Sequence, residues 1–407
     1  MTQSDHPGNR QNFLQKAGFP EGLLTLTFTR MTINTGYRLV YPFLPVFARG
    51  LGISLQSAAN IVSLRSLVGI LGPTLGSLVD VLDRQKAMHI GMAMAVIGML
   101  SIGLIPTIGG FIAGMLLVAA AKAMFDPSVL AYLGDTVAYE KRGRAIAIAE
   151  LSWSTASLIG IPAVGLLIAL GNWQTPWPVL AGAVILLMIL IQTRVQSGSS
   201  GRKRQKLASI LQSILNEPGL AAAILFTFLI CVSNQIIYVV YGAWLEDSFG
   251  LSVAQIGAAT AVLGAAELLG ESGAAAITDR IGKPGAILTG IIVSILGAVS
   301  IMVLQSGLAG SLFALFLFYA GFEFALVSLF PLITEMVPAA RGTASSIVIA
   351  ALEIGHALGA VMAPGLYFLG LNKSLIVSII LNLLALVMFQ FGIRKASTAI
   401  GARVPGE

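Results

Sequence analysis

The stretch that decides the fold is Gly72–Lys86, GPTLGSLVDVLDRQK, which ends one long apolar run and begins the next. Its charged residues, among them Asp80 and Arg84, are gathered at the junction between two apolar segments. A related stretch, AAITDRIGK, returns about 200 residues later at Ala275–Lys283. In both copies a small residue and an apolar residue precede an aspartate and basic residues. The recurrence indicates a chain built from two similar halves.

Composition predicts an integral membrane protein. The 407 residues are 56% hydrophobic and only 10% charged, whereas soluble proteins carry about 25% charged residues. Such a chain cannot hide its apolar surface in a water-facing fold, so several membrane spans are expected. The net charge of +6 does not indicate nucleic-acid binding, because the basic residues lie in short loops beside apolar runs. The single cysteine, Cys231, excludes an intrachain disulfide and is expected to be a packing residue.

Twelve apolar runs are long enough to cross a bilayer, which needs about 20 apolar residues per helix. A cleavable signal peptide is not expected, because the chain begins with a polar segment and its first apolar run is too long. Several runs exceed the minimum length, so they should tilt, bend or protrude. The expected spans are 20–48, 55–81, 87–106, 108–138, 144–170, 176–195, 219–247, 253–279, 284–305, 308–337, 342–370 and 372–394.

A polar segment divides these spans into two sets of six. The stretch SGSSGRKRQK at 197–206 is rich in serine, glycine and basic residues, which predicts a cytoplasmic linker over 196–216 with a short surface helix at Leu207–Leu215. The predicted domains are therefore a six-helix bundle at 1–195 and a second at 217–407.

The two sets look like repeats. The fifth and eleventh spans each carry glycines around a mid-span proline, Pro162 and Pro364. The segment EKRGRA at 140–145 is echoed by PAARGTA at 338–344. Repeated halves of a transporter usually meet around a central site near the bilayer midplane.

The paired loop motif resembles the cytoplasmic loops after helices 2 and 8 of the major facilitator superfamily, whose pattern is roughly G-x-L-x-D-R-x-G-R-K. The resemblance covers the chain from about Gly22 to Lys395 and implies two six-helix bundles that rock around a central cavity. The first copy departs from the pattern at Val81 and Asp83, and Ala275 replaces the glycine of the second. The matching residues are Gly76, Leu78, Asp80 and Arg84 in the first copy, and Ile277, Asp279, Arg280, Gly282 and Lys283 in the second.

The resemblance also implies a gate. In the family, the aspartate and arginine of the first loop contact neighbouring helix ends and stabilise the outward-facing state. The resemblance assigns this role to Asp80 and Arg84, with Asp135 as the expected partner. Asp279 and Arg280 are the corresponding gate residues expected in the second copy.

The fifth span is similar to the antiporter signature of the family, which centres on G-P-x-x-G-G. The segment IPAVGL at Ile161–Leu166 keeps the proline and one glycine. Lys122 stands near the place where drug exporters carry an arginine in the fourth span. Both matches are partial, and they favour a relative of the drug/proton antiporters.

The distribution of basic residues predicts the orientation. Of 24 Lys and Arg residues, 18 lie in the termini, in the linker or in loops after even-numbered spans. Only Arg49 and Lys373 lie in the opposite loops. Both termini are therefore expected in the cytoplasm, and the chain in the inner membrane of a bacterium.

Charged residues inside the spans are costly unless they face a partner or a wet cavity. The first half supplies mostly cations and the second half mostly carboxylates, so the charges either pair across the interface for structure or bind substrate and protons. Arg38, near the outer end of the first span, suits a snorkelling or gate contact. Expected substrate-binding residues are Arg30, Tyr37, Arg65, Lys122, Tyr238 and Glu323. Expected proton-coupling residues are Asp126, Glu267, Glu271, Glu323, Glu353 and His356.

Both sets carry a competing structural interpretation. Lys122 and Asp126 are four residues apart and pair readily on one helix. A carboxylic acid that is neutral when buried and ionised when wet is a natural proton carrier, and His356 can share such a proton. We interpret most of the aromatic residues as an interface belt. Tyr37 and Tyr238 lie deeper in their spans and are candidates for a cavity wall.

Three functions remain open. Proton-coupled export of a lipophilic or amphipathic small molecule is favoured by the fifth-span motif, the aromatic residues and the acidic second half. Proton-linked symport of an organic anion is favoured by the cations of the first half. A membrane receptor or assembly factor that does not transport is the third. We expect no enzyme, cofactor, metal or nucleic-acid partner, because neither a G-x-x-x-x-G-K-[ST] loop nor a metal-ligand cluster occurs. The expected partners are a small-molecule substrate, protons and the lipid bilayer, and the expected state is a monomer.

Overall fold

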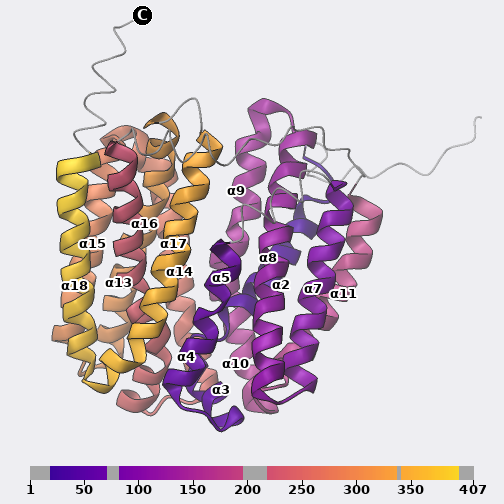
Figure 1. Cartoon of the computed structure of the whole chain (residues 1–407), viewed down its shortest axis with the longest axis horizontal. Coiled ribbons are helices and arrows are strands. Elements are labelled where there is room, and N and C mark those ends of the chain that lie inside the picture. Colours follow the sequence, from indigo (N-terminus) through magenta and orange to yellow (C-terminus); the bar gives the residue numbers. More distant parts are fainter. Residues whose placement is uncertain (1–18, 71–81, 196–217, 337–340, 394–407) are drawn as a thin grey trace, which may run out of the picture.

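The computed structural model describes residues 19–70, 82–195, 218–336 and 341–393. Figure 1 shows these residues as two groups of long helices standing side by side. The first half contains α2 (Leu23–Arg38), α3 (Leu44–Leu51), α4 (Leu55–Ser63), α5 (Arg65–Ile70), α7 (Arg84–Leu104), α8 (Ile108–Thr136), α9 (Tyr139–Thr155), the π-helix η1 (Ala156–Gly160), α10 (Ile161–Leu170) and α11 (Pro176–Arg194). The second contains α13 (Pro218–Phe249), α14 (Val253–Ile281), α15 (Lys283–Leu304), α16 (Leu308–Met336), α17 (Arg341–Phe368), α18 (Leu371–Met388) and the π-helix η3 (Phe389–Ile393).

The predicted all-helical membrane fold is confirmed. Within the described ranges, 10 helical segments are long and apolar enough to cross a membrane, and they coincide with the third to twelfth predicted spans to within a few residues. The predicted linker at 196–216 and its surface helix lie outside the described residues, so the domain boundaries remain a prediction. Asp80 and most of the first loop motif, at 71–81, also lie outside them.

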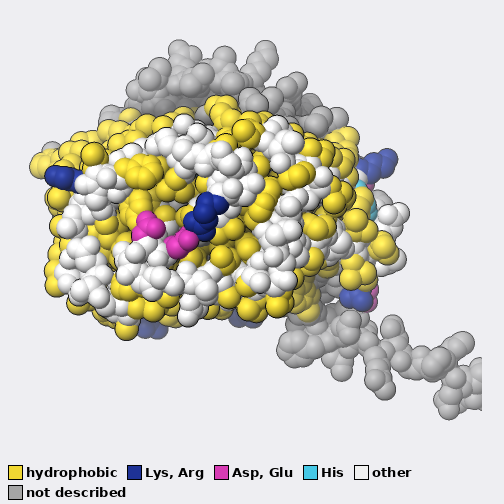
Figure 2. Space-filling view, turned by 90° about the horizontal axis from the view of Figure 1, so that it is seen from below, with side chains coloured by type: hydrophobic (Ala, Val, Ile, Leu, Met, Phe, Trp, Pro, Cys, Tyr) yellow, Lys and Arg dark blue, Asp and Glu magenta, His cyan; other side chains and the backbone are white. Residues whose placement is uncertain are grey.

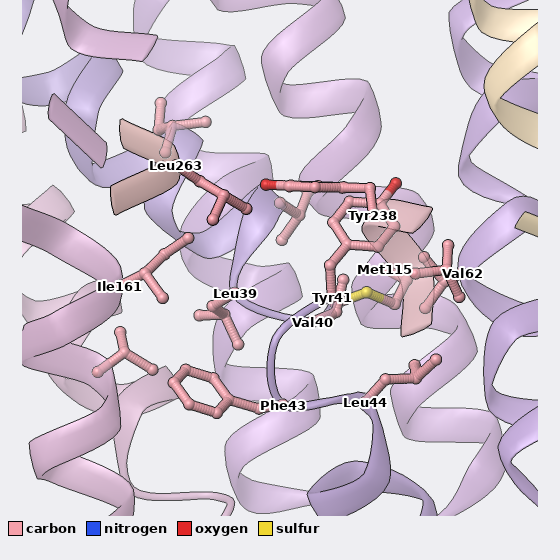
Figure 3. Close-up of a cluster of buried hydrophobic side chains, with 14 of the residues drawn as sticks. Leu39, Val40, Tyr41, Phe43, Leu44, Val62, Met115, Ile161, Tyr238 and Leu263 are labelled. Carbon is pink, nitrogen blue, oxygen red and sulfur yellow. The ribbon is translucent and has the colours of Figure 1, made fainter. Parts of the chain in front are cut away.

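The first two spans differ from the prediction of continuous helices. The chain leaves the helix between Leu39 and Phe43 and resumes it as α3 (Figure 3). Pro42 lies inside this break, and a proline lacks the N–H that an α-helix needs and restricts the residue before it. In the second span, the described residues form two short helices, α4 and α5, which meet at Leu64.

The break in the first span lies at the seam between the halves. Its side chains are buried among residues of other helices, including Tyr238 of α13 and Leu263 of α14, which belong to the second half (Figure 3). Adding a Cβ to Gly242 would place it 2.0 Å from the Pro42 carbonyl oxygen. The backbone of α13 therefore packs directly against the break.

Equivalent helices of the two halves make equivalent contacts. The fifth span approaches α2 at Gly160, where a Cβ would lie 2.1 Å from Thr35 Oγ1. The eleventh span, α17, approaches α13 at Gly359, where a Cβ would lie 2.7 Å from Gln235 Cβ. Small residues permit such close packing of helices in lipid, which accounts for the glycines of these two spans.

The halves pack tightly at the end that carries α3, which the Lys and Arg distribution predicts to lie outside; we call it the outer end. There Gly165 of α10 and Gly257 of α14 face each other, and a Cβ on either would lie 3.1 Å from the other's Cα. Arg49 of α3 and Glu246 of α13 form an ion pair at 2.9 Å. Figure 2 views this end from below and shows a closed, largely uncharged surface with a small group of charged side chains. The path between the halves is therefore closed at the outer end.

Candidate functional site

The first cluster of membrane charges joins α2, α8 and α9. Arg30 Nε donates to Asp126 Oδ1 at 3.0 Å, and its Nη1 donates to Glu150 Oε1 at 2.9 Å. The Arg30 side chain is buried, whereas 46% of the Glu150 side chain is exposed. A guanidinium with two carboxylate partners is a strong structural tie.

Lys122 extends this cluster toward the middle of the first half. Its ammonium group donates to Asp126 Oδ2 at 2.5 Å and to Asn34 Oδ1 at 2.7 Å. It also lies 4.9 Å from the centre of the Trp153 ring. The expected pair on one helix is thus present, and Asp126 lies between two cations.

Arg65 is fully enclosed by groups of the first half. Its guanidinium donates to the Tyr41 hydroxyl at 2.5 Å and to the backbone carbonyl oxygens of Tyr37 and Val62. The same group stacks 4.0 Å from the centre of the Tyr37 ring. Cation–π contacts and carbonyl acceptors replace the hydration that this charge loses on burial.

A third cluster of membrane charges joins the two halves. Arg38 Nη1 donates to Glu267 Oε2 at 3.0 Å, and its Nη2 donates to Glu267 Oε1. Both side chains are only 3% exposed. The guanidinium also donates to the Tyr238 hydroxyl at 2.8 Å and lies 4.1 Å from the centre of the Trp153 ring. The sequence placed Arg38 near the outer end, but the break after it keeps this residue deep in the protein.

The remaining carboxylates of the second half are less well paired. Glu271 accepts a hydrogen bond from the Ser154 hydroxyl at 3.4 Å, across the interface between the halves. Glu353 lies beside Gly69 and Ser66 of α5. Glu323 is 8% exposed and packs against Gly270. Among the described residues, no Lys or Arg nitrogen lies within 4 Å of these three carboxylates.

Aromatic side chains enclose the space around these charges. Tyr238 contacts Tyr41 at 4.7 Å and Tyr319 at 5.7 Å between ring centres. Tyr37 and Trp153 cover the cations of the first half. His356 of α17 is partly buried, and its ring nitrogens make no hydrogen bond to a described residue. The expected residues from seven helices are therefore brought to one region of the interface.

The two loop motifs form matching ion pairs at the opposite end. Arg84 at the start of α7 lies 3.3 Å from Asp135 near the end of α8, as expected. Lys283 at the start of α15 pairs with Glu335 near the end of α16. A small cavity of about 240 Å³ adjoins this second pair and is lined in part by Asp279. Asp279 and Arg280 are exposed, and the ion pair of the second motif is made by Lys283.

Sequence reasoning missed several of these residues. Glu335 follows Asp135 by 200 positions, as Lys283 follows Arg84 by 199, so the repeat offset was a usable signal. Trp153 and Asn34 carried no signal, because neither is unusual in an apolar span. Their importance depends on the packing of α9 against α2.

Comparisons with known proteins agree with this architecture. The sequence model of the Major Facilitator Superfamily matches residues 26–233 and residues 223–405. The chain is 25% identical to the uncharacterized MFS-type transporter YceJ of Bacillus subtilis, over 82% of this chain and 86% of that protein. It is 21% identical to the inner membrane transport protein YdhP of Escherichia coli, over 94% of this chain and 98% of that protein.

Solved structures share the fold at lower identity. The crystal structure of the peptide transporter POT in complex with sulfate superposes with a TM-score of 0.76 at 16% identity, covering 98% of each chain. A bacterial homologue of the human lysosomal transporter Spinster, in an inward-facing and unoccupied conformation, gives a TM-score of 0.75 at 15% identity, over 92% of this chain and 97% of that one.

The fold and the paired charges define a two-bundle membrane transport protein. The chain belongs to the Major Facilitator Superfamily. This places it among transporters of small molecules that reside in a membrane.

Proposed function

We propose that this chain is a proton-coupled exporter of lipophilic or amphipathic small molecules that works by alternating access. The observation that carries the proposal is an asymmetry between the halves. The membrane cations Arg30, Arg38 and Lys122 are paired with carboxylates, and Arg65 is enclosed by tyrosines and carbonyls. The carboxylates Glu323 and Glu353 form no ion pair within 4 Å among the described residues, although Arg65 and Lys122 lie near enough to Glu353 to attract its charge. The available charge in the site is therefore negative.

This asymmetry weighs against symport of an organic anion. An anionic head that bound Arg30 or Lys122 would have to displace Asp126 from contacts of 3.0 and 2.5 Å. Displacement would leave a carboxylate unpaired in a dry site, which is strongly unfavourable. The cations expected to bind substrate are accordingly assigned a structural role in the proposal.

Ion pairing also reduces the number of candidate proton-coupling residues. Asp126 and Glu267 each form a close ion pair with an arginine, so the proposal assigns them a structural role rather than proton transfer. Glu271, Glu323 and Glu353 lack such partners, which supports their role as proton carriers. A carboxylic acid that alternates between dry and wet surroundings takes up and releases a proton. His356 remains a candidate to share the proton of Glu353, three residues away.

The closed outer end supports assignment of the structure to an inward-facing state. Rocking of the halves would then break Arg38–Glu267 and Arg49–Glu246 at the outer side. The proposed gate at the other end uses Asp80, Arg84 and Asp135 in the first half, and Asp279, Arg280 and Lys283 in the second. We also propose that the protein is a monomer in a bacterial inner membrane with both termini in the cytoplasm.

Transport in proteoliposomes tests the proposal. With an acidic lumen, wild-type protein should accumulate the amphipathic dye ethidium against its gradient, and a protonophore should abolish the accumulation. The organic anion fluorescein should not accumulate in vesicles with either direction of the proton gradient. Accumulation of fluorescein alone would replace export with anion symport. Movement of neither dye, with ligand-dependent stabilisation retained, would favour a receptor.

A further inference from the structure

Several polar side chains on α13 and α16 have an atom without a hydrogen-bond partner among the described residues, Gln235 Nε2 included, and three of them concern us here. Asn234 Nδ2 and the Tyr319 hydroxyl are buried without a hydrogen bond to any described residue. Asn234 is 5% exposed and Tyr319 is 2% exposed. The third, the Glu323 carboxylate, makes no hydrogen bond or ion pair with a described residue and belongs to a residue that is 8% exposed. Buried polar groups are nearly always paired, so an unpaired set requires an explanation.

The helix geometry brings these groups to one place. Asn234 lies one turn before Tyr238 on α13, and Tyr319 lies one turn before Glu323 on α16. The rings of Tyr238 and Tyr319 contact each other at 5.7 Å between centres. Because the two helices run in opposite directions, one turn from that contact leads to Asn234 on one helix and to Glu323 on the other. The four residues therefore share one face, directly beside the Arg38–Glu267 ion pair.

The set is chemically complementary to a particular ligand. The amide Nδ2 of Asn234 can only donate, an ionised Glu323 can only accept, and the Tyr319 hydroxyl can do either. A ligand that fills all three must present a donor to Glu323 and an acceptor to Asn234. The ring of Tyr238, which contacts Tyr319, and the ring of Tyr41 beyond it supply an apolar surface next to these groups.

We infer that Asn234, Tyr319 and Glu323 form the polar subsite of the transported molecule, and that this molecule is an amphipathic amine with a neutral hydrogen-bond acceptor. The ammonium group binds Glu323, the acceptor binds the Asn234 amide, and the Tyr319 hydroxyl completes either contact. The inference rests on the proposed export function, since it names the substrate class of that site.

A matched pair of fluorescent probes tests the inference in detergent. Monodansylcadaverine carries a sulfonamide acceptor and a primary amine, and its N-acetyl derivative lacks the positive charge. Purified wild-type protein should bind the amine at least roughly tenfold more tightly, as measured by dansyl anisotropy, because a charge-assisted hydrogen bond is lost in the amide. Glu323→Gln should remove this preference. Equal affinity for the two probes, or binding of neither, overturns the substrate class.

Two apolar substitutions separate a ligand role from a structural role. Tyr319→Phe and Asn234→Leu should each weaken binding of the amine roughly three- to tenfold, the value of one neutral hydrogen bond. Because neither group is paired without ligand, the melting temperature of the ligand-free protein should hold or rise. Tyr241→Phe is the control, since its hydroxyl already pairs with Thr260 at 2.8 Å, and its affinity should stay within about twofold of wild type. Unchanged affinity in both variants, or a lower melting temperature with unchanged affinity, overturns the subsite.

Transport assays distinguish failure of the proposed subsite from failure of the proposed export function. Residue-dependent amine binding without accumulation of the same probe in proteoliposomes would overturn proton-coupled export and leave the subsite standing. Proton-driven accumulation of the probe that is indifferent to Asn234, Tyr319 and Glu323 would leave export standing and overturn the subsite.

Discussion

Arg38 on α2 and Glu267 on α14 form a two-point ion pair across the interface between the halves. Both side chains are 3% exposed, and Arg38 Nη1 lies 3.0 Å from Glu267 Oε2. The Tyr238 hydroxyl, from a third helix, accepts hydrogen bonds from the same guanidinium. Geometry of this kind lets a buried pair offset its desolvation, while loss of either partner is strongly destabilising.

Arg38→Ala should therefore destabilise the closed outer end. The variant leaves Glu267 unpaired among buried residues, which typically costs about 3–5 kcal/mol. Because opening the interface hydrates that carboxylate, the halves should separate at the outer side. Spin labels at Asn172, in the loop before α11, and at Lys373, in the first turn of α18, lie in different halves and should report a longer distance than in wild type.

The matched control for this prediction is the double variant Arg38→Gln with Glu267→Gln. It removes both charges and leaves two neutral amides that can pair, so the label distance should return most of the way to the wild-type value. An unchanged distance in Arg38→Ala would mean that the glycine contacts alone hold the outer end closed.

Arg30 should stabilise the fold rather than bind substrate. Arg30→Ala leaves Asp126 with one cation and Glu150 with none, so the detergent melting temperature of the ligand-free protein should fall steeply. Arg30→Lys keeps the charge but loses the bidentate contact and should fall less. Differential scanning fluorimetry measures both. A melting temperature that holds in Arg30→Ala, together with lost affinity for fluorescein, would return Arg30 to an anionic substrate.

The spans and the charged positions inside them could be predicted from the sequence, because each depends on local composition. Runs of about 20 apolar residues are readable without a fold, and an ionisable residue inside one is conspicuous. The ion-pair partners of these charged residues could not be predicted from the sequence. Arg38 and Glu267 are 229 positions apart, and their contact depends on how α2 and α14 pack.

The break after Arg38 explains a second limit. Pro42 signals a distortion of the first span, but it does not give the depth at which Arg38 ends. Likewise, the unpaired state of Asn234 and Tyr319 depends on neighbours from several helices. In the sequence, Asn234 and Tyr319 cannot be distinguished from any other asparagine or tyrosine of an apolar span.

The Arg84–Asp135 pair should act as a gate. Arg84→Ala and Asp80→Asn should slow transport and leave the fold intact, because a contact made in one state shifts the equilibrium by its differential energy. Asp135 is 58% exposed, so the cost to stability should be small, at most about 1 kcal/mol. Initial rates of ethidium transport, alongside melting temperatures, check the prediction.

Lys283→Ala offers a parallel test in the second half, since Lys283–Glu335 occupies the equivalent position. If both pairs gate, the double variant should be slower than either single variant. Normal transport rates in Asp80→Asn and Arg84→Ala alike would show that the gate role implied by the family does not apply to this chain.

Glu323→Gln should uncouple the transporter from protons. Gln keeps the shape of the side chain and loses its titratable proton, so accumulation of ethidium against a gradient should stop. The cavity and its aromatic walls remain, so downhill exchange of preloaded ethidium should continue at a rate within about tenfold of wild type, the loss that one charged contact typically causes. Parallel uptake and exchange assays in proteoliposomes measure both. Glu353→Gln tests the alternative carrier on α17, whose carboxylate lies beside Ser66 and near Arg65, outside the α13–α16 face. If Glu323→Gln accumulates ethidium normally and Glu353→Gln does not, the coupling proton binds beside His356 rather than on α16.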